Sequence, residues 1–190
     1  PTTAEHVATM LGDSVTMVLD GGPCEFGLES SIIRLTESGA DLLRPGGISA
    51  ERLEAAFGHL NLAQAGKSEN SSESVMPAPG MMSKHYSPRT PLFRLSNWDR
   101  NAHPASVVAR VCFGPAEPIA NESFRWTHCI SKDGELGEVA RGLYAAMRAA
   151  DESGCELIVI DECPPEGIGR ALMDRIARAE CAVKHSSSFA

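Results

Sequence analysis

Apolar residues recur at helical spacing in two stretches of the second half of the chain. In residues 135–150 they follow the period of an α-helix, and charged residues fill the other side: the apolar positions are Leu136, Val139, Ala140, Leu143, Met147 and Ala150. Residues 166–180 repeat this spacing at Ile168, Leu172, Met173 and Ile176. The pattern predicts two amphipathic helices, each with one face buried in a core.

Short apolar runs near these helices have the composition of buried strands. Residues 157–160 are all apolar and lie between charged residues, which is typical of a parallel strand covered on both faces. Residues 105–113 are rich in β-branched side chains, and residues 91–95 form a shorter apolar run. We expect one more strand at the end of residues 121–130. Strands that alternate with helices predict a small α/β layer fold.

Two shorter helices are predicted in the first half of the chain. Thr2 and Glu5 have the spacing of a capping box, which predicts a helix over residues 1–11. Ser49 is a favoured N-cap residue and predicts a helix that ends at Phe57, with the Phe57 side chain facing inward.

Apolar runs separated by turns predict a sheet in the same half. Residues 15–19 have the pattern of a buried strand and lead into the turn-forming sequence at 20–23. Residues 31–35 and 41–43 predict two further strands joined by a tight turn. Hairpins of this spacing indicate a mainly antiparallel or mixed sheet.

The middle of the chain is polar and then rich in proline. Residues 64–74 have almost nothing to bury, so mobility is expected there. Residues 77–88 (PAPGMMSKHYSP) contain three stiffening prolines and one permissive residue, Gly80, which could serve as a hinge. They also carry His85 and Tyr86, which are suited to making contacts. Two interpretations stay open, namely a stiff interdomain linker and a linker that also lies across a ligand site.

Composition and charge argue against several classes of protein. The net charge of −8 provides no overall basic field for nucleic acid or anionic lipid, and a local basic face stays open. No apolar run approaches the length of a membrane span, and the start resembles neither a signal nor a transit peptide. The six cysteines form no CxxC pair, so reduced and mostly buried thiols are expected rather than a zinc site.

The first candidate for chemistry is the sequence DGGPCEFGLESS at residues 20–31. Its glycines let backbone N–H groups approach an anion, and Ser30 and Ser31 add hydroxyl donors. It lacks the GK[ST] of a Walker loop, and a plain hairpin turn is the alternative interpretation. Glu29 is a possible general base, although a carboxylate beside a turn is more often solvated or salt-bridged. Residues 27–31 are called the GLESS segment below.

The second candidate is Arg44, which opens the RPGG turn at residues 44–47. An arginine at a strand end, followed by proline and glycines, suits bidentate binding of a phosphate or carboxylate. A surface arginine is the alternative. The sequence GIGRALMDR at residues 167–175 has two glycines before a helix, and helix packing explains them better than phosphate binding does.

Taken in order, these motifs resemble one protein family. The series consists of PTTAEHV, LDGGPCEFGLESSII, LLRPGGI, PAPGMMSKHYSP and PPEGIGRALMDR. The chain resembles the C-terminal portion of the two-domain threonylcarbamoyl-AMP synthases. The implied fold is α/β. Residues 1–60 would be the C-terminal part of a YrdC-like twisted mixed or antiparallel sheet domain, and residues 61–90 a Pro-rich linker. Residues 91–183 would be a small Rossmann-like α/β domain, and residues 184–190 a tail.

The resemblance implies a cytoplasmic enzyme that makes threonylcarbamoyl-adenylate from L-threonine, bicarbonate and ATP. A partner transferase then passes the threonylcarbamoyl group to tRNA, so tRNA is an indirect partner. Ser30 and Ser31 would belong to the pocket for threonine or the adenylate, and Arg44 would face the phosphates. His85 and Tyr86 would fold back over the nucleotide. Mg²⁺ would accompany ATP, with no protein ligand and no catalytic residue assigned.

The sequence departs from the family pattern in several places. The family begins with a large part of the catalytic domain, including a basic KxR-type motif, that is absent here. We therefore expect an N-terminally truncated synthase that is inactive alone. Met82 and Ser83 stand where basic and aromatic residues are more usual, and Ser31 stands where threonine is common. The alternative interpretation is a non-catalytic regulatory, RNA-binding or partner-binding module derived from the family.

Overall fold

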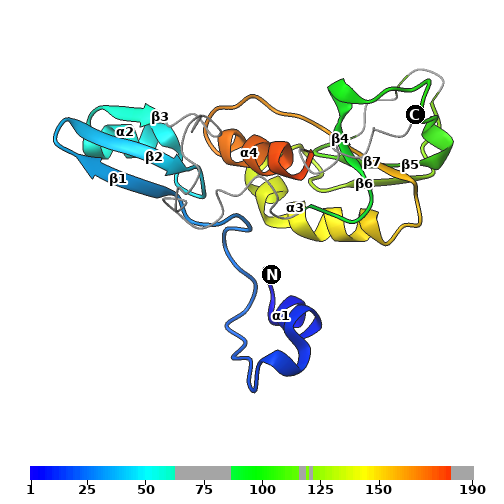
Figure 1. Cartoon of the computed structure of the whole chain (residues 1–190), viewed down its shortest axis with the longest axis horizontal. Coiled ribbons are helices and arrows are strands. Elements are labelled where there is room, and N and C mark those ends of the chain that lie inside the picture. The colour runs from blue at the N-terminus through cyan, green and yellow to red at the C-terminus, as the bar shows by residue number, and fades with distance from the viewer. Residues whose placement is uncertain (63–86, 116–118, 120–121, 181–190) are drawn as a thin grey trace, which may run out of the picture.

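The structure is a computed structural model that describes residues 1–62, 87–115, 119 and 122–180. Figure 1 shows three parts: an N-terminal arm (residues 1–26), a three-stranded sheet with one helix, and a four-stranded sheet with two helices. The polar run at 64–74, most of the proline-rich sequence including His85 and Tyr86, and the tail lie outside the described residues.

The four-stranded sheet is entirely parallel. Its strand order is β4-β7-β5-β6, formed by Leu92–Arg94, Leu157–Ile160, Val108–Cys112 and Trp126–Cys129. All four strands lie within the predicted runs, which confirms the α/β layer fold of this half. The prediction at 105–113 was too long, because residues Ala105–Val107 form a 3₁₀ turn before the strand begins.

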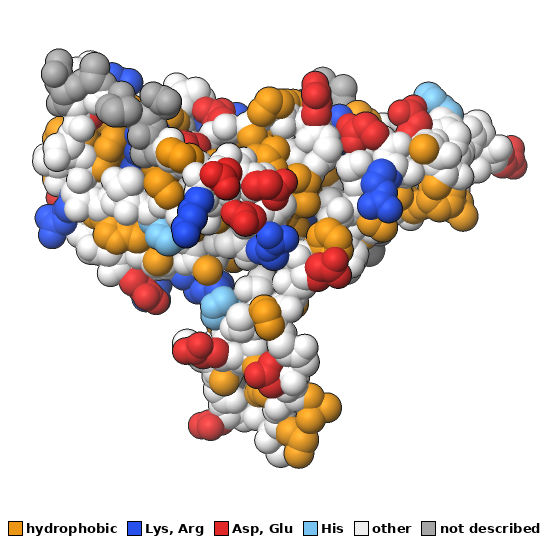
Figure 2. Space-filling model, turned by 180° about the vertical axis from the view of Figure 1, so that it is seen from behind, with side chains coloured by type: hydrophobic (Ala, Val, Ile, Leu, Met, Phe, Trp, Pro, Cys, Tyr) orange, Lys and Arg blue, Asp and Glu red, His pale blue; other side chains and the backbone are white. Residues whose placement is uncertain are grey.

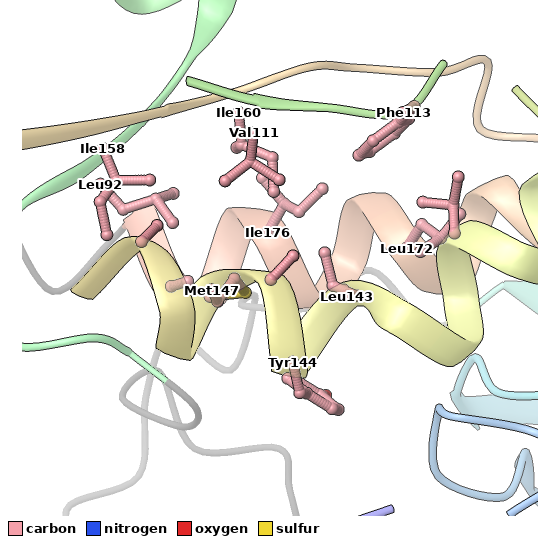
Figure 3. Close-up of a cluster of buried hydrophobic side chains, with 14 of the residues drawn as sticks. Leu92, Val111, Phe113, Leu143, Tyr144, Met147, Ile158, Ile160, Leu172 and Ile176 are labelled. Atoms are coloured by element: carbon pink, nitrogen blue, oxygen red, sulfur yellow. The ribbon is translucent and has the colours of Figure 1, made fainter. Parts of the chain in front are cut away.

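Two helices cover one face of this sheet. Helix α3 (Leu136–Asp151) and helix α4 (Gly169–Glu180) match the two amphipathic patterns. In Figure 3 the strand side chains point toward the helices, and the buried core is built from Leu92, Val111, Ile158, Ile160, Leu143, Met147, Leu172 and Ile176. The opposite face is covered by a second cluster around Trp98, Val108 and Val159.

The three-stranded sheet is mixed, as the sequence predicts. Strand β1 (Ile32–Thr36) pairs antiparallel with β2 (Gly39–Arg44), which pairs in parallel with β3 (Leu60–Leu62). Helix α2 (Ala50–Phe57) begins after the N-cap Ser49, whose Oγ accepts a hydrogen bond from the Arg52 N–H. The small core of this part consists of Ala40, Leu42, Ala50, Leu53 and Leu60.

The predicted strand at residues 15–19 is wrong. This segment runs as irregular chain after helix α1 (Ala4–Leu11) and the 3₁₀ turn Gly12–Ser14, and Met17 and Leu19 are 76% and 87% exposed. An apolar run becomes a strand only when another strand pairs with it, and no described residue does so here. Figure 2 accordingly shows apolar side chains on the surface of the projecting arm.

Two smaller expectations also need correction. The N-cap of α1 is Thr3 rather than Thr2, because the Thr3 side chain accepts the hydrogen bond from the His6 N–H. Phe57 is 43% exposed, because it is the last residue of α2 and lies outside the small core that the helix covers.

Candidate functional site

The GLESS segment and the RPGG turn lie against each other, backbone to backbone. The Gly47 N–H donates to the Glu29 carbonyl at 3.3 Å. A Cβ at position 46 would lie only 2.2 Å from the Glu29 carbonyl oxygen and 2.3 Å from the Ser31 nitrogen. Glycine at position 46 is therefore what allows these two segments to approach so closely.

Ser31 fixes this approach with its hydroxyl group. Its Oγ donates to the Ile48 carbonyl at 2.6 Å and accepts from the Ile48 N–H at 3.2 Å. One side chain thus satisfies both polar groups of the residue that follows the RPGG turn. The hydroxyl predicted to touch a ligand also holds the two motifs together.

Arg44 lies beside the GLESS segment. Its Nε and Nη2 both donate to the Ser30 carbonyl, at 3.1 Å and 3.0 Å. Its side chain is half-buried, whereas Ser30 is exposed. The structure therefore brings Ser30, Ser31 and Arg44 into one place, although they are separated by up to fourteen positions in the sequence.

Glu29 is salt-bridged and is not a solvated carboxylate. Its Oε2 lies 2.7 Å from Nε of Arg175 in α4, and its carboxylate accepts a hydrogen bond from the Tyr144 hydroxyl of α3 at 3.3 Å. Burial alone would lower the pKa of Arg175, but the hydrogen bond and charge of Glu29 raise it above its ordinary value. Glu29 therefore works as an anchor in this structure and is not placed as a free general base.

The beginning of the GLESS segment is part of the helical half of the molecule. A Cβ at Gly27 would lie 2.2 Å from the Ala140 carbonyl oxygen, so the backbone of residue 27 rests directly on α3. The next side chain, Leu28, is buried in the same core as α3 and α4. The candidate binding segment is consequently built onto the parallel-sheet part of the chain.

A cavity of about 520 Å³ lies between the N-terminal arm and helix α3. Its lining includes Cys24, Glu29, Tyr144, Arg148 and Asp151, but not Ser30, Ser31 or Arg44. At its edge Arg148 contacts the ring of His6, and burial together with the charge of Arg148 lowers the pKa of His6. The cavity therefore adjoins the GLESS segment without containing the predicted ligand-binding residues.

The described cysteines differ in their exposure. Cys112 and Cys155 are buried, but Cys24 and Cys129 are exposed, so the expectation of mostly buried thiols was only partly right. Burial and the nearby Asp161 raise the pKa of Cys112 to about 12. Within the part of the chain that is described, no group of three or more His, Cys, Asp or Glu residues could hold a metal ion.

Sequence reasoning missed Arg175 and Tyr144. A usable signal existed for Arg175, which stands seven positions after Ile168 and three after Leu172, on the apolar face of its helix. Its side chain is 1% exposed. A charged residue at an inward helical position indicates a buried partner, which here is Glu29.

Comparison with known proteins identifies the family. A family model described as "Threonylcarbamoyl-AMP synthase, C-terminal domain" matches residues 48–181, and one described as "Telomere recombination" matches residues 1–46. This chain belongs to the threonylcarbamoyl-AMP synthase family. The resemblance of the motifs in the sequence is thereby confirmed.

Individual relatives agree with this assignment. The chain is 30% identical over 190 residues to a threonylcarbamoyl-AMP synthase of Bacillus subtilis (strain 168), covering 94% of this chain and 53% of the relative. A threonylcarbamoyl-AMP synthase of Pyrococcus abyssi is also 30% identical, over 186 residues, with the same two coverages. The chain thus spans about half the length of the curated relatives it matches.

Two solved structures share the fold. The crystal structure of P. abyssi Sua5 complexed with L-threonine superposes with a TM-score of 0.75 at 26% identity, covering 95% of this chain and 54% of that one. A second structure, of P. abyssi Sua5 with alanine in place of a histidine and the following tyrosine, gives a TM-score of 0.67 at 25% identity and covers 95% of this chain and 53% of that one. The mixed α/β architecture therefore matches that of known family members.

Among the described residues, every helix is too short or too polar to cross a lipid bilayer.

Proposed function

We propose that this chain forms part of the ligand-binding machinery of a threonylcarbamoyl-AMP synthase. The observation that carries the proposal is the joint packing of the GLESS segment and the RPGG turn in a chain of this family. The reaction joins L-threonine and bicarbonate into a carbamate with loss of water. The carbamate oxygen then attacks the α-phosphate of ATP, and pyrophosphate leaves.

The candidate residues suit the needs of this reaction. Negative charge gathers on the α-phosphate and the leaving pyrophosphate, so cations and N–H or O–H donors are required around them. Arg44 would supply charge, and Ser30 would supply a hydroxyl donor near the threonine or the adenylate. Ser31 would belong to the same pocket but would hold its segment in place, because its hydroxyl proton is donated to the Ile48 carbonyl. L-threonine is the ligand of the solved P. abyssi relative, which supports threonine as a substrate here.

The linker is proposed to close over the nucleotide. His85–Tyr86 is the single His-Tyr pair in the sequence, and the same pair of residue types was replaced by alanine in a solved relative. These two residues lie outside the described part of the chain. In this proposal residues 61–90 form the linker and residues 91–183 form a Rossmann-like domain. The parallel sheet of four strands supports the assignment of that domain.

Magnesium would enter with ATP, and no protein ligand is assigned to it. Mg²⁺ would neutralise the phosphates of ATP when bound. The adenylate would then pass, in the cytoplasm, to a transferase that modifies tRNA.

Ligand-dependent thermal stability tests the proposal. The test protein is a chimera in which the 190 residues replace the half of the B. subtilis relative that they match. L-threonine and ATP together should raise the melting temperature more than either ligand alone, because each stabilises the state that binds the other. No shift with any ligand in a folded chimera would instead favour a non-catalytic module.

Arg44→Lys is the informative variant for this test. Lysine keeps the charge but cannot donate two fixed N–H groups to the Ser30 carbonyl, so the joint shift should shrink. Arg52→Lys is the matched control, because Arg52 is an exposed residue of α2 outside the site. An equal loss in both variants would argue against a specific role for Arg44.

A further inference from the structure

Arg175 is a buried cation that contacts both of the motifs proposed to bind ligands. Its Nε pairs with Glu29 of the GLESS segment at 2.7 Å, and its Nη2 donates to the Pro45 carbonyl of the RPGG turn at 3.0 Å. Its Nη1 pairs with Asp174, the preceding residue of α4. The side chain is 1% exposed, so these contacts replace its hydration.

A second helix supports the same carboxylate. Tyr144 is 9% exposed and donates from its hydroxyl to Glu29, 3.3 Å from Oε1 and 3.4 Å from Oε2. Figure 3 shows Tyr144 on the side of α3 that is turned away from the strands of the sheet. Glu29 therefore joins the N-terminal half of the chain to α3 and α4 at once.

The two acceptors of Arg175 are sequence neighbours of the candidate ligand residues. Glu29 precedes Ser30, and Pro45 follows Arg44. The guanidinium is planar and its N–H groups point in fixed directions, so one arginine can set the distance between two acceptors. Lysine carries the same charge but no such fork.

We propose that Arg175 is a positioning residue, through which the C-terminal α/β part holds the GLESS segment and the RPGG turn at the spacing that ligand binding requires. This inference rests on the proposed function, because it takes the two loops to be the ones that bind ligand. It gives the parallel-sheet part of the chain a role in substrate affinity without any contact to substrate. If Arg175 only stabilised the fold, the two loops would be unchanged in a folded variant that lacks Arg175.

Amide hydrogen exchange in the 190-residue chain, followed by NMR, measures how readily the hydrogen bonds between the two loops open. The amides of Gly47 and Ile48 are hydrogen-bonded across the two motifs, to the Glu29 carbonyl and to Ser31 Oγ. The Ala40 amide is bonded to the His59 carbonyl within the same small sheet and serves as the internal reference. In Arg175→Lys the first two amides should exchange about tenfold faster while the Ala40 amide keeps its rate.

Arg178→Lys is the matched control. Arg178 lies on the same helix at similar burial and pairs with Asp174 through Nε and Nη2, at 2.9 Å each. Its substitution should leave the exchange of Gly47 and Ile48 at the parental rate. Unchanged exchange in Arg175→Lys, or faster exchange of all three amides alike, would overturn the positioning role.

Ligand affinity then separates this inference from the proposed function. In the chimera, Arg175→Lys should raise the dissociation constant for L-threonine about tenfold, and Arg178→Lys should not, because only the former loosens the loops. Parental affinity in Arg175→Lys despite faster loop exchange overturns the inference. If the parental chimera binds neither L-threonine nor ATP, the proposed function fails, and the exchange result still decides whether Arg175 fixes the loops.

Discussion

At the residue scale, the contact between the GLESS segment and the RPGG turn requires a residue without a side chain at position 46. Gly46 lies where any Cβ would overlap the backbone of residues 29 and 31. Backbone atoms cannot move aside as a flexible side chain can. The two motifs would have to separate to admit even a methyl group.

Gly46→Ala should therefore destabilise the chain and weaken ligand binding by the chimera. We expect a loss of about 1–3 kcal/mol in the free energy of unfolding, as for other overpacked sites. Gly21→Ala is the control, because a Cβ at Gly21 would meet nothing within 4 Å. Urea denaturation of both variants measures the difference, and equal stabilities would contradict the close approach of the two motifs.

Glu180 is a buried carboxylate that is held by hydrogen bonds from two side chains. Its side chain is 4% exposed and accepts hydrogen bonds from Asn97 Nδ2 at 2.7 Å and from Arg94 Nε at 2.8 Å. Burial alone would raise the pKa of this carboxyl, but the hydrogen bonds from Asn97 and Arg94 outweigh burial and lower the pKa below its ordinary value of 4.5.

The sign of the pH dependence follows from this lowered pKa. The stabilisation by Glu180 is fully present above pH 4.5 and is lost as the pH falls through the lower pKa of the folded state. Glu180→Gln should cost about 1–3 kcal/mol at neutral pH and flatten the acid side of the stability profile. Glu37→Gln, in an exposed turn, is the control. A Glu180→Gln profile parallel to that of the parent would disprove the assignment.

At the element scale, the sequence predicts the helices best where a long apolar stripe fits only one type of secondary structure. Helices α3 and α4 and strand β7 fall at their predicted places because their patterns extend over whole elements. Residues 15–19 show the limit of such patterns, since an apolar run says nothing about which strand will lie beside it. The bond between Ser31 and Ile48 joins residues seventeen positions apart, so no local pattern could reveal it.

The buried apolar face of α4 can be tested by mutation at this scale. Leu172 is fully buried between the helices and the sheet, so Leu172→Ala should cost about 2–5 kcal/mol of unfolding free energy through lost burial and a residual cavity. Leu35→Ala is the comparison, because Leu35 is 67% exposed on the edge strand β1. Its expected cost is within about 0.5 kcal/mol. Similar costs for both variants, measured by thermal unfolding, would refute the core described for α4.

At the scale of the whole molecule, the candidate site lies where two family models meet. One model ends at residue 46 and the other begins at residue 48, on either side of Gly47 in the RPGG turn. Arg175 reaches from α4 to the Pro45 carbonyl beside this junction, and Tyr144 reaches from α3 to Glu29 of the GLESS segment. Both candidate motifs are therefore in contact with the helices of the parallel-sheet part.

Pyrophosphate release by the chimera with the B. subtilis half tests the proposed function most directly. The proposal predicts release from ATP that requires both L-threonine and bicarbonate and falls in the Arg44→Lys variant but not in Arg52→Lys. A folded chimera that releases no pyrophosphate, or releases it equally without L-threonine or bicarbonate, would contradict the proposal that this chain serves a threonylcarbamoyl-AMP synthase.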